Sequence, residues 1–167
     1  MSASASAPAN APKLDAEQVL DRLLTLIRES ERVEQFTAQR LSSAFGVTFS
    51  VFEPGYWGFG EQLSPQWSYG MEMRDKTAIG SRFSFSFNAA PGATPPLEEI
   101  CRIDYARFAS ALEAMGFKRE PYYGEHGRFI NDWFERPGMR IAVYPLGEAD
   151  APGEKASRVC VKEVQIP

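Results

Sequence analysis

Hydrophobic residues recur at spacings of three and four in three stretches of the chain, which is the period of an amphipathic helix. The clearest stretch is 94–117, where Thr94-Pro95 suits a helix start and Gly116 suits a helix end. Residues 14–29 and 32–45 show the same period, so we expect an N-terminal helical pair or one bent helix. The apolar stripe of the central stretch is Leu97, Cys101, Tyr105, Phe108, Leu112 and Met115.

Strands are predicted on both sides of this helix, because apolar and polar residues alternate there. Pro137-Gly138 separates two of these stretches and indicates a hairpin. In the last stretch the apolar positions change parity, which predicts a β-bulge near Lys162. The predicted strands are 47–52, 67–74, 81–88, 118–123, 128–136, 139–146 and 158–166.

The order of these elements predicts one α+β domain over residues 14–167. We expect an antiparallel β-sheet packed by the central helix 94–117, with the N-terminal helical pair beside it. Residues 1–13 are small, uncharged until Lys13 and interrupted by proline, so we expect them to form a disordered tether. The sequence shows no repeat of fixed period.

Charge and hydropathy exclude two classes of partner. The chain has 18 basic and 22 acidic residues and a net charge of −4, whereas nucleic-acid binders usually carry clustered basic residues. No run of 18 apolar residues is present, so we expect no membrane span. The aromatic content is high, with 12 Phe, 6 Tyr and 3 Trp, which suits both packed sheets and binding surfaces.

Candidate catalytic and metal-binding residues are few. His126 is the single histidine and follows Glu125 in a glycine-flanked turn, which is compatible with a general base but is more typical of a surface turn. Cys101 and Cys160 match no zinc spacing, and they are either a disulfide or two buried thiols. We therefore expect no catalytic residue, no metal and no cofactor.

Aromatic residues between glycines make residues 55–60 a candidate binding loop. Their side chains either pack on the sheet or form a contact surface. A second candidate is the turn at residues 122–126. We expect both segments to bind a protein partner at one edge of the sheet, through Tyr56, Trp57, Phe59, Tyr122, Tyr123, Glu125 and His126.

The stretch LEEICRIDYARFASALEAMGF, the aromatic strands after it and the closing VCVKEVQIP resemble small bacterial immunity proteins, the α+β antidotes of secreted antibacterial toxins. The resemblance covers roughly residues 47–167 as a pattern. It implies a protein that binds a cognate toxin and occludes its active site, with no catalysis of its own. Residues 1–12 are similar to the tether that follows the lipidated cysteine of bacterial lipoproteins, which implies a periplasmic protein with an N-terminal lipid anchor.

Two other functions fit the same residues. One is a carbohydrate- or small-ligand-binding module, or an enzyme, that uses the aromatic loop 55–60. The other is a secretion-associated chaperone or adaptor, which would be cytoplasmic and would keep its cysteines reduced.

Overall fold

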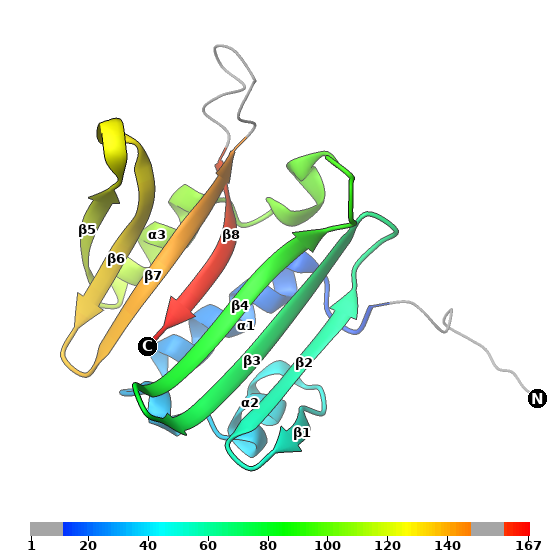
Figure 1. The fold of residues 1–167 in the computed structure, drawn as a ribbon, viewed down its shortest axis with the longest axis vertical. Helices are drawn as coiled ribbons and strands as arrows, with labels where there is room; N and C mark the ends of the chain where they lie inside the picture. Colours follow the sequence, from blue (N-terminus) through cyan, green and yellow to red (C-terminus); the bar gives the residue numbers. More distant parts are fainter. Residues whose placement is uncertain (1–11, 148–158) are drawn as a thin grey trace, which may run out of the picture.

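An eight-stranded antiparallel β-sheet dominates the computed structural model, which describes residues 12–147 and 159–167. The α-helices of this part of the chain lie behind the sheet in Figure 1, so the opposite face of the sheet is turned toward the viewer. We call that opposite face the open face. The predicted mixed α+β class is confirmed.

The elements in chain order are α1 (Ala16–Arg28), η1 (Val33–Gln35), α2 (Ala38–Phe45), β1 (Ser50–Glu53), β2 (Tyr56–Gln62), β3 (Trp67–Thr77), β4 (Gly80–Ala89), η2 (Leu97–Ile100), α3 (Tyr105–Ala114), β5 (Lys118–Tyr123), η3 (Glu125–Gly127), β6 (Phe129–Arg136), β7 (Met139–Gly147) and β8 (Val159–Ile166).

The sheet is built from two similar halves. Its strand order is β1-β2-β3-β4-β8-β7-β6-β5, so each half is a four-stranded meander that follows at least one helix. The last strands of the two meanders, β4 and β8, pair antiparallel over four residue pairs. Two like units that meet through antiparallel strands are related by a two-fold rotation about an axis normal to the sheet. The halves therefore repeat in topology, although the sequence shows no repeat.

The core lies between the helices and the covered face of the sheet. Alternation along β4 places Phe83, Phe85 and Phe87 on this face, and each is fully buried. Phe108 and Leu112 of α3 are also fully buried, as the apolar stripe predicted. Edge-to-face packing of Phe36 on Phe83, with ring centroids 5.3 Å apart, joins the η1 region to the sheet.

The predicted helix over residues 94–117 is two separate elements, so that prediction is wrong in its extent. A short 3₁₀ helix, η2, ends at Ile100, and α3 begins only after Asp104, whose side chain accepts a hydrogen bond from the Arg107 N–H at 2.8 Å. Between them, Asp104 forms an isolated β-bridge with Cys160 of β8. Asp104 itself is extended, with ψ of 177°, so the helix does not continue through it and the contact with β8 overrides the helical period of the sequence.

Arg136, at the end of β6, ties the two halves together. Its Nη2 donates hydrogen bonds to the carbonyl oxygens of Ile27 at 2.8 Å and Ser30 at 2.6 Å, where α1 ends. Its Nη1 donates to the carbonyl oxygen of Met115 at 3.3 Å, where α3 ends. One cation therefore satisfies carbonyl groups at two helix C-termini, where positive charge is favourable.

The bulge predicted near Lys162 is confirmed. Tyr144 pairs with Glu163, but Pro145 pairs with Val161, so Lys162 is the extra residue of β8. Beyond this point β8 no longer pairs with β4, and the Lys162 ammonium donates a hydrogen bond to the carbonyl oxygen of Phe87 on β4. Desolvation by burial lowers the pKa of Lys162.

None of the helices in residues 12–147 and 159–167 has the length and apolarity needed to cross a membrane. The predicted tether falls almost wholly on residues 1–11, outside the described part of the chain. At its end, the backbone N–H groups of Lys13 and Leu14 donate to the Glu61 carboxylate at 2.8 and 3.1 Å. The described chain is thus attached to β2 from residue 13 onward.

Candidate functional site

The aromatic stretch 55–60 is a strand and not the predicted loop. Residues 56–62 pair with β3 along their whole length. Trp57 and Phe59 lie on the covered face, where the Trp57 Nε1–H donates to the carbonyl oxygen of Phe36 at 3.1 Å. These contacts favour a packing role for both side chains, and partner binding by them stays a prediction.

Tyr56 lies on the open face, where it is part of a stacked group. The Arg74 guanidinium is 3.8 Å from the centre of the Tyr56 ring, and the Phe52 ring centroid is 4.9 Å from it on the β1 side. The Tyr56 hydroxyl lies 3.4 Å from Oε2 of Glu72. Arg74 and Phe52 carried no distinct signal in the sequence.

The other half of the sheet carries a similar pair. The Arg140 guanidinium of β7 is 3.7 Å from the Trp133 ring of β6. Trp133 pairs with Ala142 and Glu120, so it projects from the open face as Tyr56 does. Each half of the open face therefore presents one arginine stacked on one aromatic ring, an arrangement worth about 0.5–1 kcal/mol at exposed positions.

The two predicted contact segments do not share one edge of the sheet, so that part of the prediction is wrong. β2 lies next to the edge strand β1, whereas β5 is the opposite edge strand. The cause is the two-fold arrangement of the halves, which sends the first strands of each meander to opposite sides (Figure 1). Sequence order alone could not show this, because both strand order and pairing are properties of the fold.

The end of the β5–β6 hairpin is an exposed aromatic tip, which we define as residues 122–129. Tyr123 is 56% exposed and Phe129 is 36% exposed, and their rings pack edge to face with centroids 5.8 Å apart. Tyr122 is also exposed, on the open face beside Asn131. Glu125 and His126 form the turn itself, so the structure brings four of the predicted contact residues together here.

Hydrogen bonds hold the turn of this tip in shape. The Gly124 N–H donates to the Arg128 carbonyl oxygen at 2.7 Å, and the Arg128 N–H donates to that of Glu125 at 3.2 Å. His126 has a φ of 60°, which is uncommon outside glycine, Asn, Asp and His. Such a conformation persists only where the surroundings fix it, so the tip is organised before any partner arrives.

A buried ionic group lies on the covered face near this hairpin. Asp132 is 1% exposed and its Oδ2 is 2.8 Å from Nη2 of Arg119 and 2.8 Å from the Tyr105 hydroxyl. Burial, followed by the hydrogen bond to Asp132, raises the pKa of Tyr105, while the same carboxylate raises the pKa of Arg119. The group is thus an ion pair between Arg119 and Asp132 to which the Tyr105 hydroxyl donates a hydrogen bond.

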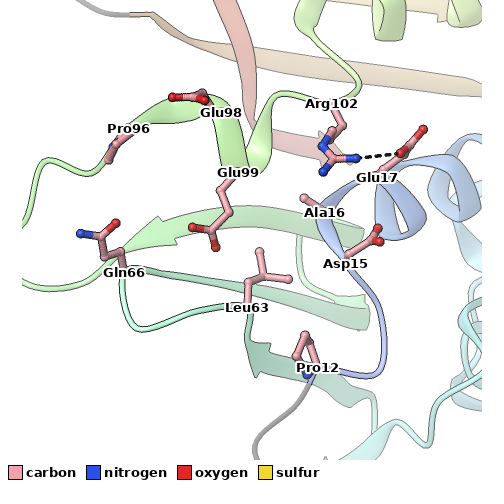
Figure 2. A pocket seen from close by; sticks show the side chains of 10 residues that line it. All are labelled: Pro12, Asp15, Ala16, Glu17, Leu63, Gln66, Pro96, Glu98, Glu99 and Arg102. Carbon is pink, nitrogen blue, oxygen red and sulfur yellow. Dashed lines mark ion pairs between the residues drawn. The ribbon is translucent and has the colours of Figure 1, made fainter.

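A hollow of about 490 Å³ lies where α1 begins, beside η2 and the β2–β3 turn, and carries several carboxylates (Figure 2). Arg102 pairs with Glu17 at 3.9 Å, and Glu99 points toward the side where Leu63 and Gln66 lie. The Asp15 carboxylate is engaged as the N-cap of α1. Within residues 12–147 and 159–167, no group of three or more His, Cys, Asp and Glu side chains could hold a metal ion.

The two cysteines form a disulfide between the segment after η2 and the start of β8. Their Cα atoms are 5.0 Å apart and 59 positions separate them in the chain. Of the two alternatives left by the sequence, the structure has the bridge and not the two thiols. Because the bond joins η2 and α3 to β8, it fixes the segment that interrupts the predicted helix.

Comparison of the chain with protein-family models, with curated proteins and with solved structures finds no match.

Proposed function

We propose that this protein is an immunity-type binding protein, which neutralises a cognate secreted bacterial toxin by occluding the toxin's active site. The observation that supports the proposal is the aromatic tip at residues 122–129. An exposed aromatic pair on a preorganised turn is the kind of element that enters a cleft at low entropic cost. Occlusion requires no chemistry from the protein itself.

The composition of the tip agrees with a protein contact. Tyr122, Tyr123 and Phe129 supply rigid contact area, and tyrosine is enriched among the residues that dominate interface energies. Glu125 adds a carboxylate at the turn, which would affect association rate more than affinity. In this proposal His126 contacts the partner from the same turn.

We further propose that the protein acts in the periplasm, held by an N-terminal lipid anchor through residues 1–12. The disulfide between Cys101 and Cys160 supports an oxidising compartment, because disulfides persist there and are rare in the cytosol. A cytoplasmic location would require the bridge to be absent in protein isolated from cells. Mass spectrometry of the native protein after alkylation decides between the two locations.

The proposal is tested by calorimetric titration with the toxin-like product of the neighbouring gene. Tyr123→Ala should weaken binding about 30-fold, which corresponds to about 2 kcal/mol for an interface anchor. Ile79→Ala is the matched control, because Ile79 is an apolar residue 86% exposed in the β3–β4 turn. Absence of binding by the wild-type protein, or equal affinity of the Tyr123→Ala variant, would contradict the proposal.

A further inference from the structure

The open face carries a hollow over β1, β2, β3, β4 and β8, away from the aromatic tip. Its volume is about 650 Å³, within the range of about 300–1,000 Å³ typical of ligand sites. Its lining includes Phe52, Glu72, Ser84 and Gln165. The hollow lies on the side of the sheet opposite to the helices, and β5 and β6 do not contribute to it.

Glycines form much of the floor of this hollow. A Cβ at Gly58 would lie 2.6 Å from the carbonyl oxygen of Met71 and 3.2 Å from a ring carbon of Phe52, so no side chain fits there. A Cβ at Gly70, in contrast, would meet no atom within 4 Å. No side chain of its own therefore covers the backbone of Gly70 on the side of the hollow, so a ligand can approach this backbone closely.

The walls offer neutral hydrogen-bonding groups together with two carboxylates, those of Glu72 and Glu163. Ser84 donates to Oε1 of Gln165 at 2.9 Å, and the lining also includes Ser86 and Asn88. Glu72 lines the hollow but already faces Arg74, with Oε1 3.6 Å from its Nε. No lysine or arginine is among the described residues that line it, so an anionic ligand would find no counter-charge there.

The second carboxylate of the hollow is that of Glu163 in β8. The side-chain amide of Gln165 donates a hydrogen bond to it. A cationic ligand would therefore compete with groups that the protein already supplies.

An apolar platform stands at one end of the hollow. The Phe52 ring is 58% exposed, and it lies above Gly58 with one ring carbon 3.2 Å from the position of a Cβ. Aromatic faces of this kind pack against the C–H faces of sugar rings, while hydroxyls and amides nearby pair with the sugar hydroxyls. Neutral hydrogen-bonding groups, carboxylates that can accept from hydroxyl groups and one exposed ring together describe a carbohydrate site.

We propose that this hollow binds a neutral oligosaccharide, with one sugar ring over Phe52 and its hydroxyl groups hydrogen-bonded to Ser84, Gln165 and Glu72. This activity is separate from toxin binding and does not depend on it, since the aromatic tip belongs to the opposite edge of the sheet.

The test is calorimetric titration of the full chain with cellohexaose, chitohexaose and maltohexaose. At least one of them should give saturable binding to the wild-type protein. Gly70→Leu should abolish that binding, because a Cβ at this position has no atom within 4 Å and the larger side chain would occupy space in the hollow. Ser68→Leu is the matched control: Ser68 is on the same strand and face but outside the lining, and it should bind normally. No saturable heat with any of the three sugars, or equal binding by Gly70→Leu, would overturn the proposal.

A second pair of variants covers the case in which Gly70→Leu does not fold. Glu72→Gln keeps the shape of the side chain and should weaken sugar binding at least tenfold, whereas Glu120→Gln on β5 should leave it unchanged. Equal affinities for the two variants would also overturn the proposal. Titration of Glu72→Gln with the toxin then separates the two functions, since toxin binding should remain at its wild-type strength.

Discussion

The guanidinium of Arg119 on the edge strand β5 lies 2.8 Å from the carboxylate of Asp132 on β6. Asp132 is almost completely buried, while Arg119 reaches solvent. The edge strand thus supplies the charge that allows a carboxylate to be buried behind the sheet, and this relationship gives the first prediction.

Arg119→Met should destabilise the protein by about 3–5 kcal/mol, because it leaves a buried carboxylate without its partner. The measurement is chemical denaturation followed by tryptophan fluorescence. Arg102→Met is the control, since Arg102 pairs with Glu17 at 3.9 Å in an exposed position and should cost less than about 1 kcal/mol. Equal losses in the two variants would show that Asp132 does not need Arg119.

Arg136→Met should lower the free energy of unfolding by about 2 kcal/mol or more, because carbonyl groups at the ends of α1 and α3 lose a charged donor. Arg140→Met, on the open face, removes only a contact with Trp133 and should cost about 1 kcal/mol or less. Thermal melts of both variants measure the two losses in stability. A smaller effect at Arg136 than at Arg140 would contradict its role in joining the two halves.

Trp57→Ala should destabilise the fold by about 3 kcal/mol, since the indole packs against the core and donates to Phe36. Tyr56→Ala, one residue earlier and on the open face, should cost about 1 kcal/mol. The pair is compared by thermal unfolding and by toxin titration. Should Trp57→Ala melt normally and bind weakly, Trp57 would be a contact residue and not a packing one.

Reduction of the disulfide should destabilise the protein by about 4 kcal/mol, the entropy model's value for a closed loop of 59 residues. Calorimetric melts with and without reductant measure this loss, and the Cys101→Ser, Cys160→Ser double variant should reproduce it. A melting temperature that does not respond to reductant would show that the pairing of Asp104 with Cys160 is sufficient without the bond.

Local sequence signals predicted much of the fold because they depend on neighbouring residues. The hairpin at Pro137-Gly138 forms as expected, with a φ of 90° at Gly138 that only glycine adopts readily. The bulge at Lys162 also follows from the parity of the apolar positions around it. In both cases the residues whose pattern predicted the hairpin or the bulge are the same residues that form it.

Where the prediction from the sequence was wrong, contacts between residues far apart in the chain determined the structure. The apolar stripe of residues 94–117 is buried as predicted at Phe108 and Leu112, but the helix breaks where Asp104 pairs with Cys160. In the structure Asp104 is the N-cap of α3, which the helical period of the sequence did not indicate. Strand β2 was missed because its glycines disfavour a strand, although Trp57, Phe59 and Glu61 alternate along it.

The candidate sites show the same limit. The aromatic tip was recognisable because Tyr122, Tyr123, Glu125 and His126 are adjacent in the chain. Phe129 joins them only through the hairpin, and the hollow brings together Phe52 and Gln165, which are far apart in the sequence. Neighbouring strands create such sites, so strand order must be known before they can be seen.

Because the pairing between β4 and β8 is short, the polypeptide could be divided into two fragments, one for each meander. Only four residue pairs join the two meanders through the sheet, and the segment between β4 and η2 links them along the chain. A gene divided within residues 90–96 would encode two fragments, each with a helix and four complete strands. Their reassembly would depend on the pairing of β4 with β8 and on the Arg136 hydrogen bonds to the end of α1. Both cysteines would belong to the second fragment, so the disulfide would stabilise that fragment alone and the two halves would recombine without a covalent bond.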